Sequence, residues 1–536
     1  MITLFPYHKM LAKGKLVRTK VFSCLLPLTS CLLISCSQSL PTDYTSSGKM
    51  PVIYPDYVNV TVPVNIAPMT FEMDDPSEEM AVRYSFGDEE IICRGDKAQP
   101  DIDDWKQLTA AAKGKAIQVD TYARKDGQWT RFKPFKIQVS PDSIDAYISY
   151  RLISPSYTNY EELTISQRCL ENFDESVIYD NMLCTDGAAG QCINCHNYQQ
   201  YNPDRMLFHA RHNLGGTITA YDGKIRKINM RNDSVLSAGV YPSWHPTLPI
   251  VVFSSNMTLQ AFHISHLNKI EVYDYGSDLI AYDVMKNEVT NIENAPDELE
   301  VFPFWAPDGK YVYYCSAHFE FPDSATNHNV EFVKRYDTAK YNLYRKSFNP
   351  ATMEFGPREL VFNAESKGMS ATLPRISPDG RFLMFTMAKY GVFHIWHHDA
   401  NLWILDLQAK ATHPVFELNS RDTESYHSWS SNGRWVVFSS RRTDGNYTRP
   451  FIAHIDKDGK CSRPFELPCA DPDFHRQFLK CYNIPEFMRG PVTIKPQDFA
   501  DVLKGDGEPV KYVQKLKSII DFKNYEFHEL NELKSY

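Results

Sequence analysis

Short apolar runs that end in turn residues recur along the chain from residue 51 onward. The clearest runs alternate between apolar and polar positions, as half-buried β-strands do: 57–62 (YVNVTV), 116–122 (AIQVDTY), 135–139 (FKIQV) and 146–152 (AYISYRL). They predict an independent all-β, sandwich-like domain over residues 51–165. Helical patterning is confined to three stretches, 103–112, 496–503 and 510–520. The expected fold is mainly β, with a helical C-terminal cap over residues 469–536.

A longer pattern repeats in the second half of the chain. Four segments place an aromatic or aliphatic residue before a tight turn and a β-rich strand: YPSWHP (241–246), FPFWAPDGK (302–310), LPRISPDGR (373–381) and YHSWSSNGR (426–434). Their centres, Trp244, Trp305, Ile376 and Trp429, lie 61, 71 and 53 residues apart. Asp-Gly or Asn-Gly turns between apolar strands predict hairpins. Four short strands in each 50 to 70 residues are typical of a propeller blade.

The repeat resembles the WD40-like repeats of the TolB β-propeller family. The resemblance covers about residues 204–468 and is weakest in the first unit, where HPTLP (245–249) replaces the Ser-Pro-Asp-Gly turn. It implies a propeller over residues 205–468. A further partial blade begins near residue 206, so five blades can be counted, and relatives of this family often close with six.

The N-terminus has the features of an export signal. Five basic residues precede an apolar run over 21–34, which is too short for a membrane span. The run ends in LISC (33–36) and resembles the lipobox of bacterial lipoproteins. That resemblance implies a signal peptide over 1–35, acylation of Cys36, and a polar tether over 36–50. Because Ser37 follows the cysteine, it also favours the outer membrane over the inner one.

Residues 192–196 (CINCH) form a CxxCH motif, the attachment pattern of c-type haem. In this interpretation Cys192 and Cys195 form thioethers with one haem c, and His196 is the proximal iron ligand. The motif lies in a short segment, 166–204, which is too small for a cytochrome domain. A CxxC pair can also bind zinc or act as a redox dithiol, but the chain offers no second ligand pair at similar spacing.

The sixth iron ligand is expected close by, at His209 or Met206. If this stretch is a β-strand, Met206 and Phe208 share one face while His209 and Arg211 share the other. His209 would then bind the iron with Arg211 on a haem propionate, or Met206 would bind it instead and give a higher potential.

Composition narrows the possible partners. A net charge of −9 without a basic patch argues against nucleic acid. Because the mature protein is expected to lie outside the cytoplasm, some of the other cysteines are expected to form disulfides, with 169–184 and 461–469 as candidate pairs. Cys315 is expected to be a buried thiol. We therefore expect a monohaem lipoprotein of the cell envelope that acts in electron transfer or in haem-linked sensing, together with a protein partner. The alternatives are a non-redox envelope scaffold with a structural haem and, with less support, a haem peroxidase or reductase.

Overall fold

The computed structural model describes residues 39–155, 162–184, 192–322 and 327–516. Its first part is a β domain with one helix, α1 (Ile102–Ala111), which Asp101 caps through hydrogen bonds to the backbone of Asp103 and Asp104. The main sheet has seven strands: β1 (Thr45–Ser46), β3 (Thr61–Pro63), β5 (Glu79–Phe86), β6 (Glu89–Gly95), β8 (Ala116–Lys125), β9 (Gln128–Arg131) and β10 (Phe135–Ser140). A small sheet adds β2 (Ile53–Tyr54), β4 (Phe71–Met73) and β7 (Lys97–Ala98). The expected helix at 103–112 is confirmed.

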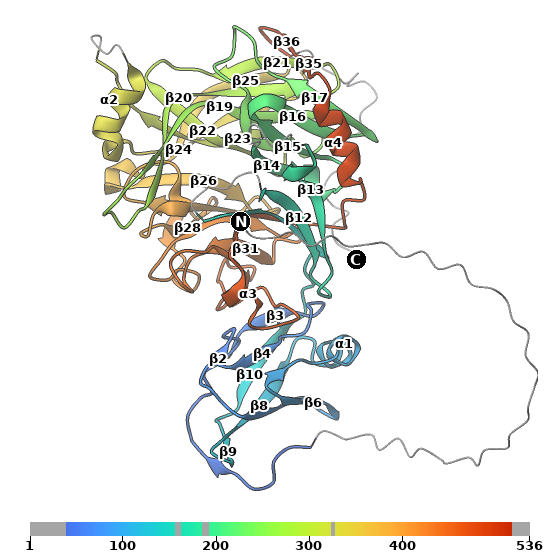
Figure 1. Cartoon of the computed structure of the whole chain (residues 1–536). Coiled ribbons are helices and arrows are strands. Elements are labelled where there is room, and N and C mark those ends of the chain that lie inside the picture. Colours follow the sequence, from blue (N-terminus) through green and yellow to red (C-terminus); the bar gives the residue numbers. More distant parts are fainter. Residues whose placement is uncertain (1–38, 156–161, 185–191, 323–326, 517–536) are drawn as a thin grey trace, which may run out of the picture. The chain divides into compact units, whose positions relative to one another are not determined.

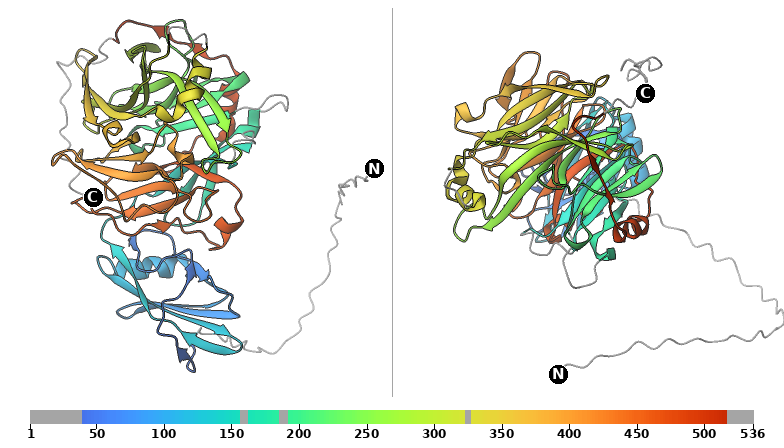
Figure 2. Two further views of the ribbon diagram at one scale, coloured as in Figure 1. Left: turned by 90° about the vertical axis from the view of Figure 1, so that its left-hand side faces the viewer. Right: turned by 90° about the horizontal axis from the view of Figure 1, so that it is seen from above.

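The remaining strands form six four-stranded antiparallel units, which follow one another in colour from teal to orange (Figures 1 and 2). We number these units as blades one to six. Blade one contains β11 (Tyr147–Ile153), β12 (Thr164–Cys169), β13 (Glu175–Asp180) and β34 (Cys481–Met488); blade two contains β14 (Cys192–Tyr198), β15 (Met206–Arg211), β16 (Gly216–Tyr221) and β17 (Lys224–Asn229); and blade three contains β18 (Gly239–Trp244), β19 (Ile250–Phe262), β20 (Ile270–Asp283) and β21 (Glu288–Glu293). Blade four contains β22 (Glu298–Trp305), β23 (Tyr311–His318), β24 (Asn342–Asn349) and β25 (Glu354–Phe362); blade five contains β26 (Ser370–Ile376), β27 (Phe382–Ala388), β28 (Asn401–Asp406) and β29 (Ala411–Pro414); and blade six contains β30 (Glu424–Trp429), β31 (Trp435–Ser440), β32 (Arg449–His454) and β33 (Phe465–Glu466).

One strand of each blade lies innermost and contacts its counterparts in the two neighbouring blades; it is the first strand of blades two to six, and β34 in blade one. The inner strands β14, β18, β22, β26, β30 and β34 follow one another in a ring, and β34 contacts β14 again. Four-stranded sheets around a closed ring of inner strands are the architecture of a β-propeller. The predicted fold class, mainly β with a propeller, is confirmed, and the blade number is six.

The ring is closed by the C-terminal part of the chain. Strand β34 pairs antiparallel with β11, so blade one combines strands that lie more than 300 residues apart in the sequence. This pairing divides the chain differently from the expected boundaries: strands β11, β12 and β13 belong to blade one, and the CxxCH motif lies in blade two. The propeller therefore includes part of the expected N-terminal domain and of the expected cap.

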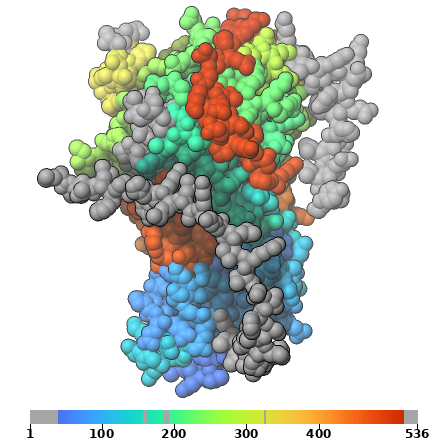
Figure 3. Space-filling view, turned by 45° about the vertical axis from the view of Figure 1, so that its right-hand side comes forward, coloured from blue at the N-terminus to red at the C-terminus, as the bar shows by residue number. Residues whose placement is uncertain are grey.

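The C-terminal segment continues along the outside of the blades, where it is drawn in red (Figure 3). Helix α4 (Pro496–Lys504), predicted at 496–503, packs Phe499 and Leu503 into the apolar core of blades one and two. The helix expected over 510–520 is absent from the described residues, which end at residue 516. Instead β35 (Glu508–Pro509) adds to β17 and β36 (Lys511–Tyr512) adds to β21, because the unpaired edge strands of two blades offer backbone partners.

Two short helices lie in the loops, α2 (His328–Arg335) and α3 (Phe474–Gln477). No helix among the described residues is long and apolar enough to cross a membrane.

Candidate functional site: the central channel

All six inner strands carry the same irregularity at the centre of the ring. Each has a β-bulge whose first residue adopts a left-handed backbone conformation, with φ between 48° and 55°: Cys195, Tyr241, Phe302, Leu373, Tyr426 and Ile484. Non-glycine residues rarely adopt such angles, and a β-branched isoleucine does so least of all. A bulge re-aims side chains, and strain of this kind is concentrated at functional sites.

The bulges enclose a central cavity that is lined from every inner strand. Its walls include Cys195 and His196 of β14, Arg375 of β26, and Ile484 and Glu486 of β34. A second, smaller cavity on the side of β26, β30 and β34 adds His427 to the lining. The two cavities offer about 20 and 10 Å³ to a water-sized molecule.

The CxxCH motif supplies one sixth of this ring. The pair Cys195-His196 occupies the place that Tyr426-His427 occupies in blade six, and a residue-proline pair occupies it in the other four blades. Asn197 and Tyr198 follow this pair along β14, just as Ser428 and Trp429 follow the equivalent pair along β30 of blade six. The motif is therefore built into a propeller blade.

His196 is enclosed by the ring. Its side chain is 1% exposed, and neither ring nitrogen has a hydrogen-bond partner among the described residues. Burial, together with the nearby charge of Arg151, lowers the pKa of His196 to about 3, so the imidazole is neutral. An unpartnered neutral imidazole is a possible metal ligand, which is why the fit of a haem has to be tested.

The folded residues do not fit a haem. A haem held by this motif needs both thiols at its edge and His196 beneath its plane. Cys195 is 4% exposed, and the 20 Å³ beside it and His196 is the space of one or two water molecules. Cofactor pockets have volumes of about 300–1,000 Å³. Haem c attachment stays a prediction of the motif, and it would require β14 to leave the ring.

The candidate sixth ligands lie on β15, next to β14, and both are engaged elsewhere. Met206 is fully buried in the apolar core that includes Phe208. His209 is 5% exposed, and its Nδ1 lies 3.2 Å from the hydroxyl of Thr217. Burial, aided by Arg211, lowers the pKa of His209 to about 3. The core contacts agree with the predicted alternation of faces along β15, because Met206 and Phe208 pack in one apolar core and Leu207 in another. Met206 and His209 are both used in packing or hydrogen bonding, so neither is placed to bind an iron held by His196.

Arg211, the candidate propionate ligand, also has a protein partner. In the amide orientation that satisfies both groups, the side-chain oxygen of Asn194 accepts a hydrogen bond from Arg211 Nε at 3.0 Å. The predicted site residues thus lie on two adjacent strands, but the fold uses them for packing and pairing. Cys36, the predicted lipidation site, lies outside the described residues.

The charged residues of the channel were not foreseen from the sequence. Arg375 donates to the backbone oxygen of Pro374 at 2.9 Å and lies over the ring of Phe304 at 4.8 Å. Among the described residues it has no carboxylate within ion-pair distance. Glu486 accepts a hydrogen bond from Asn197 at 2.8 Å through one oxygen, while the other has no partner in the described chain. The channel therefore contains a guanidinium without a paired anion.

The imidazole of His427 adds a second donor. It is 2% exposed, and both of its nitrogens lack hydrogen-bond partners among the described residues. Burial, followed by the charge of Arg375, lowers its pKa to about 3 and keeps it neutral. Glu486 responds in the opposite sense: burial raises its pKa to about 7, although Asn197 and Arg375 oppose the rise.

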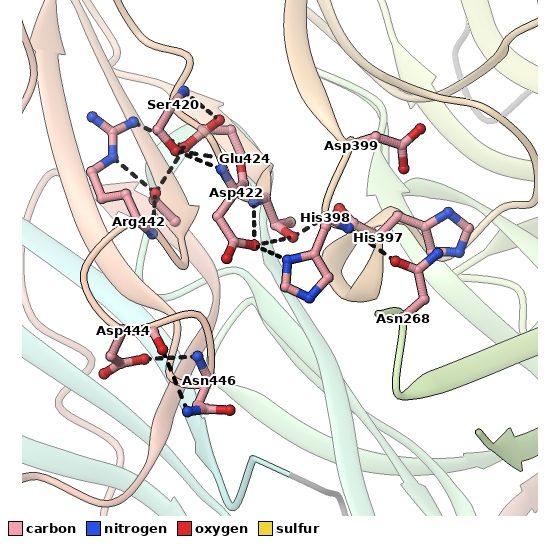
Figure 4. Close-up of polar contacts among 12 residues, drawn as sticks. Asn268, His397, His398, Asp399, Ser420, Asp422, Glu424, Arg442, Asp444 and Asn446 are labelled. Atoms are coloured by element: carbon pink, nitrogen blue, oxygen red, sulfur yellow. Dashed lines mark hydrogen bonds and ion pairs between the residues drawn. The ribbon is translucent and has the colours of Figure 1, made fainter. Parts of the chain in front are cut away.

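A larger polar cluster in the loops contrasts with the channel because its members pair with one another (Figure 4). Asn268, from the β19–β20 loop, accepts a hydrogen bond from the backbone of His398, whose Nδ1 lies 2.9 Å from Asp422. Next to it, His397 Nε2 lies 2.7 Å from Glu271. These contacts fix the loop of blade three to those of blades five and six, so we assign the cluster a structural role. The part of the chain that the structure describes holds no group of three or more His, Cys, Asp or Glu side chains arranged to bind a metal ion.

Comparison with known proteins adds little to this geometry. No protein-family model matches the chain, and no curated protein matches it. Among solved structures, an oligogalacturonate lyase from Vibrio parahaemolyticus is 13% identical, with 59% of this chain and 92% of that one covered and a TM-score of 0.28. Prolyl oligopeptidase B from Galerina marginata is 10% identical, with 66% and 52% covered and a TM-score of 0.32. Likenesses of this size carry no inference about activity.

The cysteines other than those of the motif are buried or half-buried thiols. Cys169, Cys461 and Cys469 are free thiols, so the candidate pairs 169–184 and 461–469 are not formed. Cys315 is fully buried in the core of the propeller, as predicted.

One signal in the sequence could have placed the motif in a blade. The run CHNY (195–198) is followed by NPDR (202–205), which matches the order of YHSW (426–429) and SNGR (431–434). Tyr198 replaces the usual tryptophan and Asp204 the usual glycine, so the repeat is hard to recognise.

Proposed function

We propose that this chain is a lipid-anchored envelope protein whose TolB-like propeller binds a carboxylate group of a protein partner in its central channel. The observation that carries the proposal is Arg375, a half-buried guanidinium on the channel wall without an ion pair among the described residues. A charge that is partly withdrawn from water is stabilised when an anion pairs with it. A planar carboxylate accepts two parallel hydrogen bonds from a guanidinium, and the unpartnered nitrogens of His427 offer a further donor. The size of the cavity suits the tip of such a group and excludes a large ligand.

Binding of a small carboxylate tests this proposal. We expect N-acetyl-Gly-Gly to raise the melting temperature in a concentration-dependent way at pH 6, and its uncharged amide to have no effect. Arg375→Met should weaken binding of the acid by about ten-fold or more, because a charge-assisted hydrogen bond contributes about 1.5–3 kcal/mol. Arg421→Met, at an exposed arginine, is the matched control. Equal effects of the acid and the amide on the wild-type protein would refute the proposal.

The raised pKa of Glu486 predicts a pH dependence. The folded state holds this proton up to about pH 7, whereas an unfolded glutamate releases it near pH 4.3. Between these values the folded state binds more protons, so stability falls as pH rises, and the loss is complete above pH 7. Glu486→Gln should therefore be more stable than wild type by up to about 3–4 kcal/mol at pH 8 and nearly equal at pH 4. Unfolding by denaturant at both values measures this; an equal difference at both would count against it.

Haem staining after denaturing gel electrophoresis tests the prediction of covalent haem attachment. We expect that full-length protein, exported by a host with an active cytochrome c assembly system, carries no covalent haem after denaturing electrophoresis. The closed ring around Cys195 and His196 leaves no room for the group. A c-type cytochrome expressed in the same cells is the positive control. Haem staining that disappears in Cys195→Ala would instead establish attachment and make electron transfer the leading function.

A further inference from the structure

A thiol, an imidazole and a carboxylate lie in line where blade six ends, outside the channel. Cys469 Sγ is 3.5 Å from His475 Nε2, and His475 Nδ1 is 2.6 Å from an oxygen of Glu466. The three residues are 6%, 2% and 4% exposed, respectively. Glu466 ends β33 and His475 lies in α3, so the loop between these elements places the thiol against the imidazole.

Two further groups complete the surroundings of the sulfur. Arg168 Nη1, from blade one, donates to Cys469 Sγ at 3.4 Å, and its Nη2 is hydrogen-bonded to the backbone oxygen of Pro468. The hydroxyl of Tyr482 lies 3.2 Å from His475 Nε2. A guanidinium and an imidazole thus face one sulfur, and the carboxylate of Glu466 holds the imidazole in place, as in activated nucleophiles.

The charges favour the thiolate. Burial alone raises the pKa of Cys469, but His475 and Arg168 outweigh burial and bring the value to about 7. The same contacts raise the pKa of His475 to about 9, against the effect of its own burial. Tyr54 and Tyr57 also face this region, and both stay neutral because burial raises their pKa values.

Cys93 shows that the arrangement is particular to Cys469. It is also 6% exposed, yet burial raises its pKa to about 11. Exposure is therefore equal at the two thiols, but His475 and Arg168 lower the pKa of Cys469 and no cation among the described residues lowers that of Cys93. This gives an internal control within one protein molecule.

We propose that Cys469 is a redox modification site that small hydroperoxides oxidise to a sulfenic acid. The thiolate sulfur attacks one oxygen of hydrogen peroxide, an S–O bond forms and the O–O bond breaks. The sulfur loses two electrons and the peroxide gains them. The hydroxide that leaves takes the proton of the His475 imidazolium and departs as water. A thiol with so little exposed surface admits a reactant of this size and excludes larger substrates.

Oxidation changes the charge at the site. Before it, the thiolate and Glu466 balance Arg168 and the protonated His475. Afterwards the sulfenic acid and the imidazole are neutral, so Glu466, beside the imidazole, and Arg168, beside the sulfur, remain as one anion and one cation. The site can thus take the modification without a net buried charge.

The test compares two cysteines in the same folded molecule. Full-length protein is treated with limiting hydrogen peroxide and a dimedone probe, and modified Cys469 and Cys93 are counted by mass spectrometry between pH 5 and 10. We expect Cys469 to react at least about ten-fold faster at pH 7, with its rate levelling off above about pH 8. Equal rates, or a Cys469 rate that still climbs above pH 9, would overturn the proposal.

Two variants test whether the reactivity of Cys469 depends on His475 and not only on how accessible the thiol is. His475→Gln should slow modification of Cys469 about ten-fold at pH 7 and leave Cys93 unchanged, while His413→Gln, at an exposed histidine, should change neither. If His475→Gln unfolds the protein, both thiols become reactive together. The comparison within the wild-type molecule then decides the proposal by itself.

Discussion

A chain ended after Lys480 should fail to form the closed propeller. The truncation removes β34, which is the inner strand of blade one and pairs with β11 along its length. Three of its large side chains, Tyr482, Phe487 and Met488, are at most 2% exposed. Their burial contributes roughly 1.5–3 kcal/mol each, and the lost sheet hydrogen bonds add to it. The sum is comparable to the whole stability of a typical domain, about 5–15 kcal/mol.

A second truncation provides the matched control. A chain ended after Arg489 keeps β34 and loses only α4, β35 and β36. We expect it to unfold cooperatively at a lowered temperature, whereas the chain ended after Lys480 should show no cooperative thermal transition by circular dichroism. A peptide covering 478–490, added in trans, should restore the transition by supplying the missing strand. Cooperative unfolding of the shorter chain at the wild-type temperature would contradict the closure mechanism.

Trp435→Ala should lower the free energy of unfolding by about 3–5 kcal/mol. The indole, on β31 of blade six, is fully buried in a core shared with the N-terminal domain. Its Nε1 donates to the backbone oxygen of Ser143 at 3.1 Å, and its ring meets that of His454 edge to face at 4.9 Å. Alanine leaves a cavity and an unpaired backbone carbonyl at Ser143, and both changes lower the free energy of unfolding.

Trp129→Ala is the same substitution in a different setting. Trp129 is half-buried on β9, where the guanidinium groups of Arg94 and Arg124 lie over its ring. We expect a loss of about 1 kcal/mol or less, because an exposed cation–π contact contributes only about 0.5–1 kcal/mol. Denaturant unfolding of the two variants side by side measures the difference. Equal losses would show that Trp435 does not join the two cores.

The sequence repeats predicted four blades, and part of a fifth near residue 206, because local patterning creates them. Each of the units centred on Trp244, Trp305, Ile376 and Trp429 contains its own inner strand, turn and second strand. Blade one could not be predicted in this way, because its inner strand comes from the far end of the chain. Its other strands alternate like those of the preceding domain, and nothing local separates the two.

The channel was harder to foresee than the blades. Which side chains reach it depends on a left-handed residue in each inner strand, and residues such as Leu373 and Ile484 give no hint of that conformation. The haem motif drew attention to Cys195 and His196, which do lie in the channel. Arg375 lies in a run that is interpreted only as a repeat position, and Glu486 lies in the stretch assigned to the C-terminal cap.

The pairing of β34 with β11 also determines when blade one can be completed during synthesis. During synthesis β11 emerges first, and its partner follows more than 300 residues later. At about 5–20 residues per second, the strand waits some tens of seconds with one edge unsatisfied. Throughout that interval it can join the wrong neighbour or another molecule. A nascent or partly translocated chain is therefore most vulnerable to aggregation just before its last blade strand arrives, and a helper that shields the edge of β11 would act in that window.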